Sequence, residues 1–506
     1  MNSKELSNSL KITDSLEDNI KALKEIFNND TNIIFRNIEN RHYSDFKACI
    51  MFMDNMVNQA SIASNIILPL VEYEYFNFLN SNTLSEIQSK IIISPSVAIC
   101  NEAIKVVASI LSGDSVLLID GFSKFIIIDT REFKTRNISE PVSENVVRGP
   151  REGFTEYLST NVSLLRRRIK DPNFKVVPRV LGRVTQTNIC ICYIENIALP
   201  EIVSELSHRL DAIDIDGIID SQYIEEYIKD SPFSIFKTIG NTERPDIVAS
   251  KLLEGRIAIL CDGSPFALML PYIFIEYLQS NEDYYNNYAF ATFNRFLRIF
   301  SFVLTSSVPA LYVALVTYHQ ELIPTPLILN IGASHESVPF PTSLEAFLML
   351  LGFDILREAG VRLPKPTGQA VSIIGALVLG QAAVEARLVS SPMIIVVALT
   401  GICSFLVPKM LGSIIIVRFI FLLLASILGL YGYIFGVIGL SIYLNSLKSF
   451  GIPYMLATYD VTSKNFKDAA LRMPIWTRKL RPLLISQRNK KRQTLKKGGR
   501  KPNEKP

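Results

Sequence analysis

Charge-free apolar stretches are confined to the second half of the chain. The first 290 residues mix polar and apolar positions as a globular protein does, whereas four later stretches contain no charged residue. These are Ile299–Tyr318 with 20 residues, Pro366–Val384 with 19, Leu388–Pro408 with 21 and Phe419–Leu447 with 29. A bilayer core about 30 Å thick needs about 20 helical residues, so each stretch is long enough to cross it. The pattern predicts an all-α polytopic membrane domain at 293–448.

Two ambiguous segments leave the number of membrane segments at four to six. The last stretch fits one tilted helix or a helical hairpin, because its glycines can serve either a turn or close helix contacts. These glycines are Gly429, Gly432, Gly436 and Gly439. Residues 344–356 are apolar but short and carry two acidic side chains, which predicts a re-entrant or interfacial segment.

Lys and Arg placement predicts the orientation of these segments. From Arg472 to the end there are 13 basic residues, and Arg295 and Arg298 precede the first stretch. Residues 319–356 contain no Lys or Arg, so the loop after the first crossing is expected outside. An even number of crossings then places the N-terminal region and the basic tail, 449–506, in the cytosol.

The N-terminal region carries short apolar segments of strand type between amphipathic segments of helix type. Strands are predicted at Val116–Asp120, Phe125–Asp129, Asn188–Glu195 and Arg256–Cys261, and helices at Asp45–Leu68, Pro200–Asp211 and Gln222–Lys229. This alternation predicts an α/β cytosolic region. We place a flexible segment at 1–35, α/β subdomains at 36–165 and 166–262, and a juxtamembrane linker at 263–292.

Residues that carry catalytic or metal-binding chemistry are sparse. The chain has four histidines and six cysteines, so neither a histidine metal cage nor a disulfide framework is predicted. It has no G-x-x-x-x-G-K-[ST] phosphate loop, no H-E-x-x-H and no G-x-S-x-G. Outside the basic tail, acidic residues outnumber basic ones, which disfavours nucleic-acid binding. We expect no enzyme activity, no cofactor and no metal.

Two basic segments of the N-terminal region are open to two interpretations. Arg148 and Arg151 belong to a glycine-containing loop of the kind that binds anions through backbone N–H groups. Arg166, Arg167 and Arg168 end a predicted helix, where positive charge complements the macrodipole. These arginines are candidates for phosphate or nucleotide binding, or for salt bridges to acidic neighbours within or between subunits. We favour the salt bridges.

Longer motifs are similar to those of a known family. They are DGSPFALMLPY (262–272), EDYY (282–285), RFLRIF (295–300), YHQELIP (318–324), VPFP (338–341), LREAGVRLPKPTGQAVSIIGALVLGQAAVEA (356–386) and PMIIVVALTGI (392–402), with EPVSENVVRGPREGFTE (140–156) and LLRRRIKDPNFKV (164–176) before them. Together they closely resemble the A subunit of GerA-type spore germination receptors, over about residues 35–485.

The resemblance implies a nutrient-responsive receptor in the inner membrane of a bacterial spore. Such a receptor combines an A subunit with a multi-spanning B subunit that senses the nutrient and a C-subunit lipoprotein. It starts germination with release of monovalent cations. Family A subunits are expected to form a ring oligomer, a pentamer, whose helices enclose a pore. The implied role is a nutrient-gated cation channel subunit, and a non-conducting scaffold or signal-transducing subunit of the same complex is the alternative.

Two positions depart from the family pattern. His335 stands before the VPFP segment, where Arg is usual, and Arg387 follows VEA, where Gly is common. Both put local details in question, such as the charge of the outer loop, and leave the resemblance intact.

Several apolar residues are candidates for the pore and its gate. Pro309 lies in the middle of the first stretch and predicts a kink, because proline removes one helical hydrogen bond. Val371, Ile374 and Val378 are spaced by three and four residues and share one helical face. Such a stripe either packs against neighbouring helices or forms a constriction that closes a pore by dewetting.

Three ionisable residues lie at or within the expected membrane boundary. They are Glu358, Glu385 and Arg387. Ionisable groups at this depth pair with one another or face water rather than lipid. A pore-mouth charge ring, a pair between subunits and simple interfacial charges are the three interpretations.

Overall fold

The computed structural model of the chain divides into two compact units. Unit 1 is Met1–Lys229, Ile239–Pro271 and Arg478–Pro506, and unit 2 is Asp230–Thr238 and Tyr272–Thr477. The structure describes residues 13–27, 30–43, 45–74, 83–132, 141, 144, 146, 148–362, 380–455, 471–477, 481, 486, 489 and 492.

Unit 1 contains two five-stranded sheets in which every pair of neighbouring strands is antiparallel. The strand order is β1-β2-β4-β5-β3 in the first sheet and β6-β7-β9-β10-β8 in the second. The first sheet consists of β1 (Ile33–Glu39), β2 (Lys47–Met53), β3 (Val97–Cys100), β4 (Ser115–Ile119) and β5 (Phe125–Ile128). The second consists of β6 (Phe174–Leu181), β7 (Thr187–Ile194), β8 (Gly240–Thr242), β9 (Ile257–Cys261) and β10 (Ala267–Leu270).

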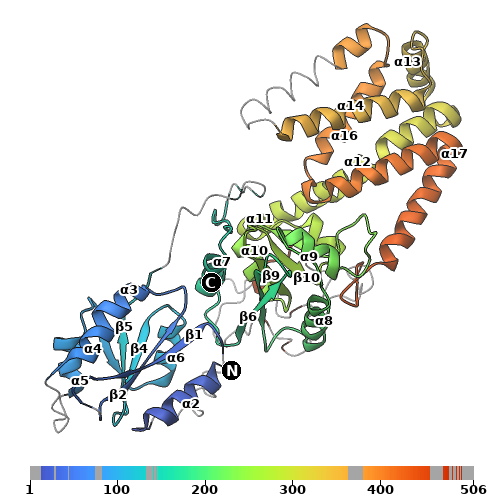
Figure 1. The fold of residues 1–506 in the computed structure, drawn as a ribbon. Helices are drawn as coiled ribbons and strands as arrows, with labels where there is room; N and C mark the ends of the chain where they lie inside the picture. Colours follow the sequence, from blue (N-terminus) through green and yellow to red (C-terminus); the bar gives the residue numbers. More distant parts are fainter. Residues whose placement is uncertain are drawn as a thin grey trace. The chain divides into compact units, whose positions relative to one another are not determined.

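The two sheets belong to one fold that occurs twice in the chain (Figure 1). Each repeat opens with a helix, α2 (Leu16–Ile26) or α7 (Leu158–Arg168), and places another, α6 (Ala103–Ile110) or α10 (Pro245–Leu252), before its last two strands. Between the second and third strands lie α3 (Gln59–Ile62), α4 (Leu68–Glu72) and α5 (Thr83–Glu86) in the first repeat, and α8 (Pro200–Asp211) and α9 (Ser221–Ile228) in the second. The α/β region is therefore an internal duplication.

The two repeats also share a hydrogen bond between equivalent positions. The N–H of Leu16 donates to the Asp120 carboxylate at 3.0 Å and the N–H of Leu158 donates to Asp262 at 3.1 Å, and both bonds join residues 104 positions apart. In each case the aspartate after the fourth strand holds the start of the opening helix. The sequence analysis did not detect this duplication, because the two halves share only scattered residues such as these.

Helices cover both faces of the first sheet. Apolar side chains of α2 and α6 pack on one face, and those of α3, α4 and the helical turns after α5 pack on the other. The interior strand β2, which lies between β1 and β4, is therefore buried on both sides, with six of its seven residues buried. The helix predicted at Asp45–Leu68 is correct only in its second half: Lys47–Met53 is strand β2, and the helical turns begin at Gln59. The strand was missed because a strand buried on both faces lacks the alternation that distinguishes it from a helix.

The predicted mixture of helices and strands in the N-terminal region is confirmed. The predicted strands correspond to β4, β5, β7 and β9, and two predicted helices correspond to α8 and α9. The expected boundaries differ from the structure in three places. Residues 1–35 contain α2 and the start of β1, residues 263–292 contain β10, and the subdomain boundary near 165 falls inside α7. Hydrophobic periodicity locates helices and strands, but it does not show which sheet each strand joins.

Buried polar contacts join the two repeats within unit 1. Arg166 on α7 forms an ion pair with Asp30, and the two side chains are only 2% and 3% exposed. The Lys175 ammonium donates to the carbonyl of Phe27 at 3.0 Å, and the Ser163 hydroxyl donates to the carbonyl of Asn55 at 2.9 Å. The opening helix of the second repeat thus docks on the first.

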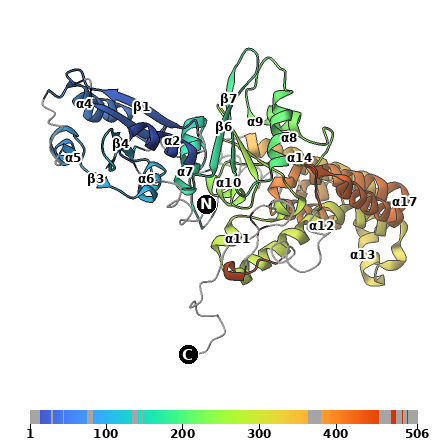
Figure 2. The same cartoon turned by 90° about the horizontal axis from the view of Figure 1, so that it is seen from below.

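Unit 2 is mainly helical. Its longer helices are α12 (Tyr288–Tyr318), α13 (Thr325–His335), α14 (Thr342–Arg362), α16 (Ser391–Ser404) and α17 (Leu411–Ser446). Side chains of α12, α14, α16 and α17 share one apolar cluster, and Figures 1 and 2 both show α12 and α17 side by side. Among the described residues, Tyr288–Tyr318 and Pro408–Ser446 are long and apolar enough to cross a membrane, and Ser391–Phe405 is a shorter apolar helix.

Helix α17 folds back on itself at Gly429. This residue has φ 60° and ψ −137°, and the two halves of the helix meet there at an angle (Figure 1). A straight helix would separate Ser413 from Tyr443 by about 45 Å. Instead, the Ser413 hydroxyl donates to the Ile235 carbonyl at 2.5 Å, and the Ile235 N–H donates to the Tyr443 hydroxyl at 3.2 Å. The hairpin alternative for the last apolar stretch is the one that the structure adopts.

Helix α2 should be essential to the first repeat, although it lies in the segment expected to be flexible. Leu23 is completely buried between α2 and the sheet, whereas Glu25 on the same helix is exposed. In residues 13–271 expressed alone, Leu23→Ala should reduce the free energy of unfolding by about 2–5 kcal/mol. Glu25→Ala should change it by less than about 0.5 kcal/mol.

Urea unfolding followed by circular dichroism measures both variants. Residues 35–262, which lack α2 and β10, should be far less stable than residues 13–271. Equal unfolding midpoints for the two fragments would contradict the packing of α2 against the first sheet.

Candidate functional site: buried charge clusters of the helical region

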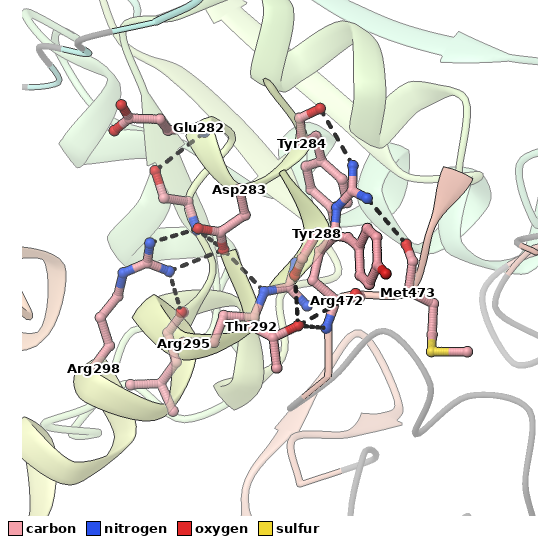
Figure 3. Close-up of polar contacts among 11 residues, drawn as sticks. Glu282, Asp283, Tyr284, Tyr288, Thr292, Arg295, Arg298, Arg472 and Met473 are labelled. Carbon is pink, nitrogen blue, oxygen red and sulfur yellow. Dashed lines mark hydrogen bonds and ion pairs between the residues drawn. The ribbon is translucent and has the colours of Figure 1, made fainter. Parts of the chain in front are cut away.

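The first charge cluster lies where α12 begins (Figure 3). The Asp283 carboxylate accepts a hydrogen bond from Arg295 Nε at 2.9 Å, and from Arg298 Nη1 at 3.0 Å and Nη2 at 2.6 Å. The Asp283 side chain is 2% exposed, and those of Arg295 and Arg298 are 1% and 15% exposed. One carboxylate thus holds two guanidinium groups away from water.

Local structure aligns these three side chains. Asp283 lies in the short helix α11 (Glu282–Tyr285), directly before α12. Arg295 and Arg298 are three residues apart on α12, so they lie on one face of the helix. Hydrogen bonds between ionised groups are stronger than neutral ones, and burial strengthens them further. The cluster fixes the start of α12 to the segment that precedes it.

The C-terminal segment of unit 2 joins the same cluster. The guanidinium groups of Arg295 and Arg472 lie 5.5 Å and 5.7 Å from the ring centre of Tyr284, within the range of cation–π contacts. The N–H of Arg472 donates to the Thr292 hydroxyl at 3.2 Å. Figure 3 shows Arg472 beside Tyr284 and Thr292. The chain after the last helix therefore returns to the first turns of α12.

A second cluster lies between α14 and α17. Arg418 is completely buried and forms an ion pair with Asp354, and Arg357 Nη2 lies 3.1 Å from the other oxygen of Asp354. Removing one partner of a buried ion pair costs about 3–5 kcal/mol, because a buried charge is left unpaired. Arg418 can therefore lie within an otherwise apolar helix only while Asp354 faces it.

Helix α14 is longer than the expected re-entrant segment at 344–356. It has 21 residues, which span about 31 Å; of its acidic side chains, Glu345 is buried and Asp354 is 13% exposed. The prediction treated these charges as a sign that the segment is interrupted. The structure instead pairs them with residues of other helices, so they do not end α14.

The predicted membrane-boundary charges do not form one cluster. Glu358 forms an exposed ion pair with Arg362 at 2.6 Å, one helical turn further on. Gln381 donates to Glu385 at 3.4 Å, and among the described residues no ion pair joins Glu385 to Arg387. An exposed pair of the Glu358–Arg362 type contributes only about 0.3–0.5 kcal/mol.

Arg387 occupies a backbone conformation that suits glycine. Its φ is 55°, in the left-handed region, which is costly for residues with a Cβ atom. The glycine that the family resemblance leads one to expect here would adopt this conformation without strain. Arg387→Gly should therefore relieve local strain.

The candidate pore residues are described only in part. Helix α12 continues through Pro309 from Tyr288 to Tyr318, and Pro309 is buried. Val371, Ile374 and Val378 lie outside the described residues, so the constriction stays a prediction.

The arginines at the end of α7 contact carboxylates of the same chain. Arg167 forms an ion pair with Glu152, and Arg168 Nη2 donates to the other oxygen of Glu152 at 2.6 Å. Burial raises the pKa of Glu152, but these two hydrogen bonds together hold that pKa below its ordinary value. The stabilisation is present at neutral pH and is lost as pH falls through the lowered pKa. Arg148 and Arg151 are exposed.

The partners in these clusters were not predicted from the sequence. Arg295 and Arg298 served only as a topology signal, and Asp283 and Arg418 were not among the candidate residues. The available signal was a single charge in or beside an apolar stretch, since such charges are usually paired. The sequence could not show which acid meets which arginine, because Asp354 and Arg418 come from helices far apart in the chain.

The described residues thus combine two helices long and apolar enough to cross a membrane with a separate α/β unit. The family described as Bacillus/Clostridium GerA spore germination protein matches residues 21–484. The chain belongs to this GerA family.

Individual relatives cover most of the chain. Spore germination protein KA of Bacillus subtilis (strain 168) is 42% identical over 484 residues, which cover 95% of this chain and 89% of that protein. Spore germination protein B1 of the same organism is 37% identical over 477 residues, which cover 94% and 98%. The crystal structure of the N-terminal domain of the A subunit of the Bacillus megaterium spore germinant receptor GerK3 is 33% identical, covering 53% of this chain and 98% of that chain with a TM-score of 0.42.

Asp283→Asn should destabilise unit 2 strongly. The substitution keeps the shape of the side chain but leaves Arg295 and Arg298 buried without their counter-charge, which costs about 3–5 kcal/mol. We expect a clear fall in the thermal unfolding temperature of the full-length chain in detergent, measured by light scattering and intrinsic fluorescence. Glu282→Gln is the control, because Glu282 takes part through its backbone N–H, which donates to Ser280. An unchanged unfolding temperature in Asp283→Asn would show that the cluster does not hold α12.

Proposed function

We propose that the chain is the A subunit of a nutrient-responsive spore germination receptor, and that it assembles into a ring, a pentamer, whose helices form a nutrient-gated cation channel. The observation that carries this proposal is a helical region that buries its charges in internal pairs. Its helices can therefore lie in a membrane while the α/β duplication stays in water. Membership of the GerA family supports the germination role.

The fold-back at Gly429 supports a topology with six membrane segments. Helix α12, helix α14, the apolar stretch 366–384, α16 and the two halves of α17 supply them. Both ends of α17 contact the Ser234–Ile235 loop, while the Tyr318 hydroxyl donates to the carbonyl of Ser426 at 2.6 Å, near the fold-back. A crossing by α12 then places the α/β region and the C-terminal segment on one side, which we assign to the cytosol.

The proposed partners follow from the family role. A multi-spanning B subunit would sense the nutrient and a C-subunit lipoprotein would complete the receptor in the spore inner membrane. Monovalent cations would pass through the ring. No catalytic step is proposed for this chain.

A gate at the stripe of Val371, Ile374 and Val378 is the most specific part of the proposal. A ring of apolar side chains blocks ions because a cation there loses its hydration without a polar replacement. Val371→Ala or Ile374→Ser should wet the constriction and leak potassium without nutrient. Potassium flux and protein abundance in sporulating cells measure this effect. Val361→Ala is the matched control, since Val361 on α14 is 78% exposed.

Two results would contradict different parts of the proposal. Normal abundance without a leak in Val371→Ala, Ile374→Ser or the corresponding Val378→Ala would place the gate elsewhere, such as near Pro309. Purified ring oligomers that conduct no ions in liposomes with the other subunits and nutrient present would favour the non-conducting scaffold.

A further inference from the structure

Glu345 is a carboxylate at which four elements of unit 2 meet. It lies in the first turn of α14 and is 1% exposed. One of its oxygens accepts the backbone N–H of Ser390 at 2.5 Å and the Ser390 hydroxyl at 2.6 Å. Ser390 is the residue that caps the N-terminus of α16, where unpaired N–H groups attract negative charge. This oxygen therefore joins α14 to α16.

The second oxygen of Glu345 faces a histidine. Within the described part of the chain it has no hydrogen-bond partner, and His335 Nδ1 at the end of α13 lies 3.4 Å away. The other ring nitrogen, Nε2, lies 3.2 Å from the hydroxyl of Tyr312 on α12. The His335 side chain is 17% exposed, whereas that of Glu345 is fully buried. The histidine thus connects the buried carboxylate to the surface.

The groups around Glu345 leave its charge dependent on His335. Tyr312 and Ser390 are uncharged, Glu336 next to His335 is exposed, and no Lys or Arg among the described residues pairs with Glu345. A buried carboxylate without a counter-charge is costly. Histidine is the side chain that ordinarily gains its charge between pH 5 and 8. Glu345 therefore has a counter-charge only when the imidazole is protonated.

We propose that His335 and Glu345 form a proton-binding site in the helical region. A proton from solvent binds the imidazole, so that Nδ1–H donates to the free oxygen of Glu345 and Nε2–H donates to the Tyr312 hydroxyl. Protonation ties α13 to α14, and through Ser390 to α16, by a charged contact. Loss of the proton removes the counter-charge of Glu345 and leaves this carboxylate with the α16 N-terminus and, at most, a weaker hydrogen bond from the neutral imidazole. The site stands on this geometry and does not depend on ion conduction by the chain.

Thermal unfolding of the full-length chain in detergent at about pH 5.5 and pH 8 tests the site. His335→Gln removes the charge at both values. At the lower pH the wild type should unfold at a clearly higher temperature than His335→Gln, and at the higher pH the two should coincide. The sign follows from linkage, since a pair that needs the proton stabilises at low pH and is lost as pH rises. In a Glu345→Gln background, His335→Gln should change the unfolding temperature by the same amount at both pH values.

His319→Gln is the matched control. His319 lies at the end of α12, and its Nδ1 is 3.4 Å from the carbonyl of Ala314 rather than from a carboxylate. Its effect should not depend on pH. If His335→Gln does not fold, His335→Lys is the variant that tests the proposal. Its permanent positive charge should keep the unfolding temperature high at pH 8. An effect of His335→Gln that is equal at both pH values, or a wild-type midpoint no more pH-dependent than that of His335→Lys, would overturn the proposal.

Discussion

The helical region depends on ion pairs that hold its buried arginines to acidic neighbours. Asp283 holds Arg295 and Arg298 at the start of α12, and Asp354 holds Arg418 in the first part of α17. A bilayer offers no water to replace these partners, so the same contacts that stabilise the fold decide where the helices can lie. The charges therefore act as connectors between helices rather than as interruptions of them.

A second constraint is the fold-back of α17 at Gly429. A Cβ atom at this position would lie 2.8 Å from the Tyr318 side chain, and φ is positive, so both space and backbone favour glycine. The turn brings both ends of the helix to one loop and its apex to the end of α12. The turn thereby ties α17 to the end of α12, whereas the cluster at Asp283 ties the start of α12 to α11 and to Arg472.

Sequence reasoning was most successful where one physical signal decides the structure. Apolar strands such as β4 and β7 and the amphipathic helix α8 were located, since burial fixes their composition. It failed at β2, where burial on both faces hides the strand period, and it missed the duplication, which survives in topology and in bonds such as Leu16–Asp120 and Leu158–Asp262. The pairs at Asp354 and Glu345 could not be predicted, because tertiary packing of distant helices selects the partners.

The proposed topology is tested most directly by cysteine accessibility in inverted and right-side-out vesicles. Single cysteines at Lys21, Asn330, Tyr431 and Lys448, all exposed, would be introduced after the native cysteines are replaced. We predict that Lys21 and Lys448 are labelled only from the cytosolic side, and Asn330 and Tyr431, at the apex of α17, only from the opposite side. Labelling of positions 431 and 448 from the same side would contradict the hairpin crossing and the six-segment arrangement.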